Sequence, residues 1–199
     1  MQIGGTRVFW GAKRLCDLAF SAVLILPLLV CGLGLLCLNP RLNPGPLIFL
    51  QPRVGQHGRV FVMYKFRTMR PASCGPRFAD AEGDRIGRLG GLMRRFRIDE
   101  LPQIVNVLRG EMSLIGPRPE QPEFVSQYRR VLPDYDLRHR IRPGLSGLSQ
   151  VVEGYTSDTH GTERKLALDL RYIQSCGFRM EAYVMWRTLV TVATGQGAI

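Results

Sequence analysis

The sequence predicts an α+β protein that begins with a membrane-inserting helix and continues as a mainly helical domain with a small β-hairpin. The run Leu18–Leu38 contains 21 residues without a charge, which is long enough for a helix that crosses a bilayer. The segments Leu47–Leu50 and Arg59–Lys65 flank two glycines as the strands of a hairpin do. Several later segments have apolar residues at helical spacing. We therefore divide the chain into a membrane-inserting helix at residues 1–38 and a globular domain at residues 39–199.

The N-terminal element leaves two alternatives open. Residues 1–12 resemble a loosely held leader that places Phe9 and Trp10 at the membrane interface. Pro27 lies near the middle of the uncharged run, where it removes a backbone hydrogen bond and kinks a helix. Basic residues flank the run on both sides, so the charge rule gives no orientation. The residues favour a helix that crosses the membrane over a re-entrant helix, which bends and returns to the same face, and both fit.

The rest of the chain is interpreted from turn residues and helical spacing. Asn39–Pro46 is predicted to be a turn-rich exit from the membrane, and residues 71–84 to be a mobile loop over the site. The helix expected at Gln121–Val131 has an apolar face near arginines, and Arg138–Arg142 extends the charge. Such an amphipathic helix often lies on anionic lipid, and an ordinary surface helix fits equally well. Further helices are expected at Ile86–Phe96, Glu163–Cys176 and Glu181–Val192.

The charge balance indicates an anionic partner. The chain has 27 Lys and Arg residues against 16 Asp and Glu, a net charge of +11. A phosphate-bearing substrate, lipid head groups and nucleic acid all suit this excess. A membrane-tethered nucleic-acid-binding protein is therefore the alternative function, although no aromatic residues alternate with the arginines and no recognition motif is present. The five cysteines lack Cys-x-x-Cys spacing, which favours reduced thiols over a disulfide framework or a metal site.

Two adjacent acids, Asp99 and Glu100, stand between a cluster of arginines and Pro102, a residue suited to the first turn of a helix. The simplest interpretation of Asp99 is a helix N-cap. The second acid, the surplus of arginines and the nearby Arg118, which lies between two prolines, favour a phosphate-binding site instead. A carboxylate can act as a nucleophile on phosphorus. A glycosidase is disfavoured, because neighbouring acids rarely face each other across about 5 Å of substrate. Gly110 offers a left-handed stop for the helix that follows.

Several blocks of the sequence also carry a resemblance to a known family. From about Lys13 to the C-terminus the chain resembles the bacterial sugar transferases, the monotopic phosphoglycosyl transferases that start glycoconjugate assembly on a polyprenyl phosphate. The matching blocks are Gly45–Gly55, Tyr64–Met69, Asp99–Gln103, Asn106–Pro119 and Arg142–Gly147. The resemblance implies a re-entrant helix broken near Pro27, on the cytoplasmic face of the bacterial inner membrane. Leu26 departs from the serine that commonly precedes this proline in the family.

The resemblance also implies the roles of the site residues. Asp99 would attack the sugar-linked phosphorus of a UDP-sugar, releasing UMP, and a polyprenyl phosphate such as undecaprenyl phosphate would then resolve the aspartyl intermediate. Asp99 and Glu100 would be the catalytic residues and would hold Mg²⁺. The substrate-binding residues would be Lys65, Arg67, Arg94, Arg118 and Arg142.

The expected partners are the UDP-sugar, the polyprenyl phosphate and membrane lipid, without nucleic acid, and a homodimer is left open. A second departure follows Gln150, where the chain lacks the basic residue usual in the family. We expect the missing basic residue to change the preference for sugar or nucleotide. We do not expect it to change the chemistry.

Overall fold

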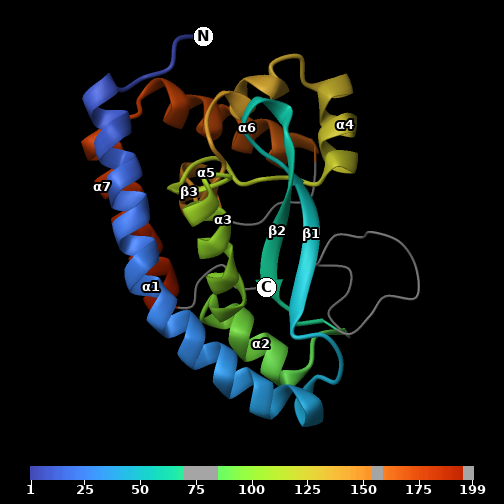
Figure 1. Ribbon diagram of the computed structural model, residues 1–199. Coiled ribbons are helices and arrows are strands. Elements are labelled where there is room, and N and C mark those ends of the chain that lie inside the picture. Colours follow the sequence, from blue (N-terminus) through green and yellow to red (C-terminus); the bar gives the residue numbers. More distant parts are fainter. Residues whose placement is uncertain (70–84, 154–158, 195–199) are drawn as a thin grey trace.

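The computed structural model describes residues 1–69, 85–153 and 159–194, and helices account for most of it (Figure 1). The predicted loop at residues 71–84 lies outside the described residues. The helices are α1 Arg7–Leu42, α2 Arg88–Arg95, α3 Ile104–Arg109, α4 Pro122–Val131, α5 Leu148–Val152, α6 Thr159–Gln174 and α7 Phe178–Thr194. Short 3-10 helices are η1 Gln56–Gly58, η3 Ile98–Gln103 and η4 Tyr135–Arg140, and the strands are β1 Ile48–Val54, β2 Val60–Phe66, β3 Ser113–Ile115 and β4 Gly144–Ser146.

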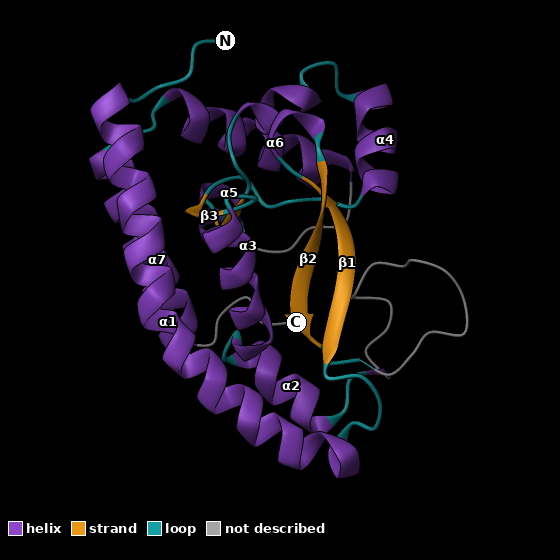
Figure 2. Cartoon of the chain, viewed as in Figure 1, coloured by secondary structure: helices purple, strands orange, loops and turns teal. Residues whose placement is uncertain are grey.

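The predicted hairpin is confirmed. Strands β1 and β2 pair antiparallel from Ile48 opposite Phe66 to Val54 opposite Val60, and they stand at the edge of the helical body (Figure 2). Gly58 has φ +74° in the turn, a conformation that side chains with a Cβ rarely adopt. The second sheet is a short parallel pair of β3 and β4, which the sequence did not reveal because each strand has only three residues.

Helix α1 is one continuous element of 36 residues, with Pro27 and Pro40 inside it, and it curves along the length of the domain (Figure 1). The side chain of Thr6 caps its start by accepting a hydrogen bond from the backbone N–H of Phe9. The helix continues to Leu42, so the exit expected from Asn39 onward begins about one turn later. Of the helices described, it alone is long and apolar enough to cross a membrane.

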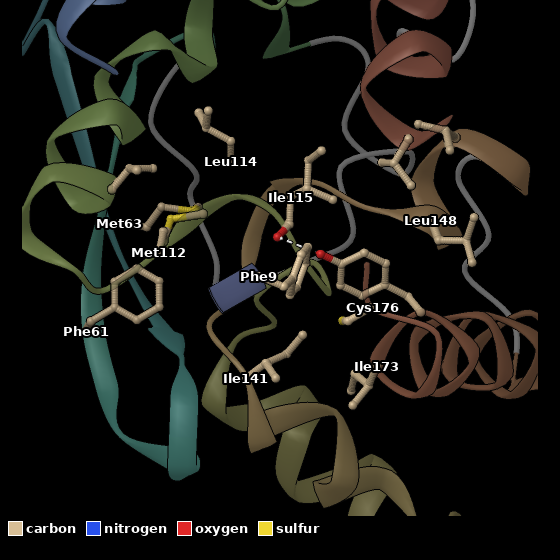
Figure 3. Packing of buried hydrophobic residues seen from close by; sticks show 14 residues of the cluster. Phe9, Phe61, Met63, Met112, Leu114, Ile115, Ile141, Leu148, Ile173 and Cys176 are labelled. Atoms are coloured by element: carbon tan, nitrogen blue, oxygen red, sulfur yellow. Dashed lines mark hydrogen bonds between the residues drawn. The ribbon is translucent and has the colours of Figure 1, made fainter. Parts of the chain in front are cut away.

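The leader expected at residues 1–12 is wrong. Phe9 is 2% exposed and belongs to the main core, where its ring meets the ring of Phe178 edge-on at 5.3 Å. Figure 3 shows Phe9 among side chains from β2, β3 and α6. The backbone N–H of Gly4 donates to the Ile173 carbonyl at 2.9 Å. The start of the chain is therefore packed into the globular body, because α7 supplies an aromatic partner that no local pattern indicates.

The buried face of α1 is unusual because it is largely polar. Lys13, Asp17 and Ser21 lie one turn apart and are at most 8% exposed. The Nζ of Lys13 lies 2.7 Å from Oε2 of Glu181 in α7, and Oδ1 of Asp17 accepts the N–H of Leu114 in β3 at 3.0 Å. The opposite face carries exposed apolar side chains, including Val8, Leu15, Leu18, Phe20, Val23, Leu26, Leu29, Val30, Leu33 and Leu36. The polar face therefore binds the protein, and the apolar face points outward.

The structure distinguishes the two alternatives left open for α4 and changes one expectation for the basic surface. Val125 of α4 is 1% exposed and packs in a second core cluster with Tyr135 and Leu166, so the apolar face of α4 covers this core and does not face outward. Arg138 is 6% exposed and does not extend a surface charge. Arg129 of α4 does remain at the surface, paired with Asp136 at 2.7 Å.

Candidate active site

The acid pair lies in η3, between α2 and α3. Arg97 precedes the turn with φ 56°, in the left-handed region, and reverses the chain after α2. Pro102 lies inside the 3-10 turn, and the α-helix begins only at Ile104. Ile104 is fully buried, and Gly110 ends α3 with φ 82°, as predicted. The apolar side of α3 thus anchors the turn that presents the two acids.

Glu100 is only 7% exposed, and three cationic side chains surround its carboxylate. Its Oε1 is 3.3 Å from Nζ of Lys65, 3.4 Å from Nη2 of Arg118 and 3.8 Å from Nη1 of Arg97. Burial opposes ionisation, but these charges outweigh it and hold the pKa of Glu100 well below its usual range. Glu100 is therefore an ionised anchor that holds Lys65 and Arg118 together.

Asp99 has a different environment. It is 8% exposed, and its Oδ1 has no hydrogen-bond partner among the described residues. Burial and the charge of Glu100 raise the pKa of Asp99 to about 6, against the opposing charges of Lys65, Arg94 and Arg97. An N-cap oxygen would accept a backbone N–H, and Oδ1 of Asp99 accepts none. A buried acceptor without a partner is costly, and such a group points to a reactive or ligand-binding role.

Lys65 reaches the acids from the end of β2, where the sequence placed it. Burial lowers the pKa of Lys65 to about 8, although the charge of Glu100 acts in the opposite direction. Lys65 is therefore mostly protonated at neutral pH and lacks strong hydration, a suitable state for binding a phosphate oxygen.

The loop that carries Arg118 is fixed by close backbone packing between β3 and β4. The N–H of Gly116 donates to the carbonyl of Ser146 at 2.8 Å, and the N–H of Gly144 donates to the carbonyl of Pro117 at 2.9 Å. A Cβ on Gly144 would lie 2.1 Å from the nitrogen of Gly116, so no side chain fits there. The two strands thus position the loop so that the side chain of Arg118 lies beside Glu100.

The other predicted cations are placed differently. The guanidinium of Arg67 donates to four backbone carbonyls, those of Asn43, Pro44, Pro46 and Met69. This geometry favours a structural role in fixing the exit from α1. Arg94 donates to Oγ1 of Thr68 at 3.0 Å, and its charge lowers the pKa of Asp99, so it does border the acid pair. Arg142 is half-buried, and its backbone packs beside Gly116.

Sequence reasoning missed the residues that support this loop. Arg138 donates to the carbonyl of Arg118 at 2.8 Å and forms a buried ion pair with Asp169 at 2.7 Å. Arg53 donates to the carbonyl of Pro119 at 3.0 Å. One signal was available for Asp169, an acid on the helix face that also carries Leu166 and Ile173, because an acid among core positions needs a buried partner.

The donor atoms of the site bear on whether a metal ion can bind there. The described residues contain no group of three or more His, Cys, Asp and Glu side chains that could hold a metal. The unpartnered Oδ1 of Asp99 nevertheless fits Mg²⁺, which binds one or two carboxylates and otherwise waters and substrate phosphates. Oε1 of Glu100 already faces three cations, so Asp99 offers the better ligand of the two.

Comparisons with known proteins match nearly the whole chain. A family model described as bacterial sugar transferase matches residues 8–195. A UDP-N-acetylgalactosamine-undecaprenyl-phosphate N-acetylgalactosaminephosphotransferase from Aeromonas hydrophila is 48% identical over 158 residues, which cover 78% of this chain and 37% of the relative. A UDP-glucose:undecaprenyl-phosphate glucose-1-phosphate transferase from Caulobacter vibrioides is 37% identical over 193 residues, 94% of this chain and 71% of the relative.

An exopolysaccharide production protein from Rhizobium leguminosarum bv. phaseoli is 35% identical over 197 residues, 93% of this chain and 97% of the relative. The chain thus spans little more than a third of the Aeromonas relative and almost all of the Rhizobium one. The acid pair, the prolines around Arg118 and the supporting strands all lie inside the matched region. The chain therefore belongs to the bacterial sugar transferase family.

Proposed function

We propose that this protein transfers a sugar-1-phosphate from a UDP-sugar to a polyprenyl phosphate, such as undecaprenyl phosphate, through a covalent intermediate on Asp99. The observation that carries the proposal is the buried, unpartnered Oδ1 of Asp99 beside the cations that Glu100 gathers. An acid held among phosphate-binding cations suits nucleophilic attack on phosphorus. The names of the relatives support the substrate classes.

The reaction takes two displacements at one phosphorus atom. In the first, an oxygen of Asp99 attacks the sugar-linked phosphorus, the bond to the UMP oxygen breaks, and UMP leaves with the electron pair. In the second, an oxygen of polyprenyl phosphate attacks the same phosphorus, and the bond to Asp99 breaks. The carboxylate is regenerated, and the sugar leaves on a polyprenyl diphosphate. The product suits the first membrane step of glycoconjugate or polysaccharide assembly.

The residues around Asp99 divide the remaining work. Lys65 and Arg118 neutralise the phosphate oxygens, and Arg94 lies close enough to add its charge. Glu100 keeps Lys65 and Arg118 in place between turnovers. Asp99, assisted by Glu100, would hold Mg²⁺, whose charge would neutralise the diphosphate when bound. Ionisation of Asp99 is required, and a pKa of about 6 leaves it about nine-tenths ionised at pH 7.

We also propose that α1 is re-entrant and that the protein lies on the cytoplasmic face of the inner membrane. Both ends of α1 contact the same globular body: Lys13 pairs with Glu181 near the start, and Leu35 packs with Phe66 and Met93 near the end. A helix that crosses the bilayer would have to give up one of these sets of contacts. The outward apolar face of α1 would lie in lipid, and exposed side chains of α7 such as Trp186 would extend it.

Release of UMP tests the proposed function. The purified full chain is incubated with undecaprenyl phosphate, Mg²⁺ and a panel of UDP-sugars that includes UDP-glucose and UDP-N-acetylgalactosamine, because the relatives name both sugars. UMP release that requires Asp99 and yields a polyprenyl diphosphate sugar is expected. No release with any sugar, together with salt-sensitive retention of DNA in a gel shift, would favour the nucleic-acid alternative, which the comparisons do not support.

A further inference from the structure

A buried ion pair lies outside the acid pair and takes no direct part in the proposed chemistry. Nη2 of Arg138 lies 2.7 Å from Oδ2 of Asp169, and the two side chains are 6% and 1% exposed. Burying two charges costs more free energy than an exposed pair does. Such a pair needs good geometry and further hydrogen bonds to offset this cost.

The pair is held from both ends by further hydrogen bonds. Nη1 of Arg138 donates to the hydroxyl of Tyr135 at 2.7 Å, and the guanidinium lies 5.1 Å from the centre of the Tyr135 ring. Oδ1 of Asp169 accepts the hydroxyl of Ser149 at 2.8 Å. The planar guanidinium is thus fixed in orientation by η4, α5 and α6 together.

The nitrogen that pairs with Asp169 also reaches the active-site loop. Nη2 of Arg138 also donates to the backbone carbonyl of Arg118 at 2.8 Å. The neighbouring residues, Pro117 and Pro119, have no N–H group, so the loop supplies few donors of its own. Its three successive carbonyls take donors from elsewhere: Gly144 for Pro117, Arg138 for Arg118, and Arg53 for Pro119.

We propose that Arg138 and Asp169 are positioning residues that fix the backbone of Arg118 and thereby aim its guanidinium at the substrate phosphate. The inference rests on the proposed function, in which Arg118 binds phosphate. Asp169 orients Arg138, and Arg138 holds the carbonyl of the residue whose side chain lies 3.4 Å from Glu100. A displacement of about 1 Å in a positioned group costs on the order of a hundredfold in rate.

A double-mutant cycle between Asp169→Asn and Arg118→Lys tests this inference. Asparagine keeps the size of Asp169 and removes its charge, and lysine keeps the charge of Arg118 but loses the planar fork. Each single variant should lower kcat/KM for the UDP-sugar by about a hundredfold. If Asp169 acts through Arg118, the double variant should fall only a few-fold below the weaker single variant. Losses that multiply to about ten-thousandfold would overturn the proposal, because independent effects combine in that way.

Two further variants keep the test decisive. Asp136→Asn, on the same element as Arg138, removes an exposed ion pair with Arg129 and the charge beside Nδ1 of His139, and it should leave kcat/KM unchanged. Ser149→Ala removes one partner of Asp169 without leaving an unpaired charge, so it serves if Asp169→Asn does not fold. Its few-fold loss should disappear in the Arg118→Lys background, and a loss that persists there would contradict the proposal.

Hydrogen–deuterium exchange separates this inference from the proposed function. Exchange in residues 113–120 should increase in Asp169→Asn and stay at the wild-type level in Asp136→Asn. If the wild-type chain releases no UMP from any UDP-sugar, the proposed function fails while the exchange measurement still decides the positioning role. Unchanged exchange at residues 113–120 in Asp169→Asn would refute it.

Discussion

Replacing Asp99 by asparagine should stabilise the folded protein at pH 7. The native environment raises the pKa of Asp99 from 3.8 to about 6, and this shift corresponds to about 3 kcal/mol of native-state cost for the ionised carboxylate. The side chain is only 8% exposed, so solvent screening reduces the figure little. A buried amide without full hydrogen bonding offsets part of the gain, so we expect Asp99→Asn to raise the free energy of unfolding by about 1–3 kcal/mol.

The pH dependence of this gain identifies its cause. Because the native pKa lies above the unfolded one, the cost is absent well below pH 3.8, grows between pH 3.8 and 6, and is complete above pH 6. In thermal unfolding in detergent at pH 7, Asp99→Asn should therefore have a higher Tm than wild type. The Tm should rise by about 2–4 °C for each kcal/mol of added unfolding free energy. The difference should fall to under about 1 kcal/mol at pH 4.

Glu100→Gln is the matched control, since it removes the neighbouring acid that the cations stabilise. This variant should be less stable than wild type at pH 7, because Lys65, Arg97 and Arg118 lose their shared counter-ion. An Asp99→Asn variant that melts at or below the wild-type temperature at pH 7, or that gains equally at pH 4 and pH 7, would refute the assignment of a destabilised nucleophile.

Three other predictions concern rate and membrane attachment. The plot of kcat/KM against pH should be bell-shaped, with limbs near the pKa of Asp99, about 6, and of Lys65, about 8. Because the charge of Glu100 raises both pKa values, Glu100→Gln should move both limbs to lower pH. Limbs that move apart in this variant would contradict the electrostatic coupling. Arg118→Lys should lose about a hundredfold in kcat/KM without losing Tm, whereas near-normal turnover would make this arginine structural. A chain that begins at Asn39 should fail to fold in detergent, because α1 contributes to the core; a cooperative melt of that chain would show that the body is independent of α1.

The parts of this fold that the sequence predicted depend on local signals. The hairpin follows from two short strand-like segments joined through Gly55 and Gly58, and the end of α3 follows from Gly110. The acid pair was identified because two carboxylates among arginines are unusual wherever they occur. Neighbouring residues decide each of these features, so the rest of the fold is not needed to recognise them.

The parts that the sequence did not predict depend on distant contacts. Phe9 is buried by α7, and Lys13 pairs with Glu181, 168 positions away. Arg67 and Arg138 are arginines of the same basic chain as Arg118, but their guanidinium groups bind protein acceptors. Arg67 donates to backbone carbonyls, and Arg138 pairs with Asp169. An arginine therefore binds substrate or supports structure according to which acceptors the fold brings to it, and composition alone does not separate the two.

Intact-mass spectrometry of the protein with a UDP-sugar and Mg²⁺, in the absence of polyprenyl phosphate, tests directly whether Asp99 forms a covalent intermediate. We expect release of UMP and a mass increase of one sugar phosphate on wild type, which disappears when polyprenyl phosphate is added and never forms on Asp99→Asn. A wild-type protein that carries no adduct under these conditions, or an Asp99→Asn variant that turns over at a comparable rate, would contradict the covalent intermediate. Polyprenyl phosphate would then attack the UDP-sugar directly, and Asp99 would serve the site as a metal ligand.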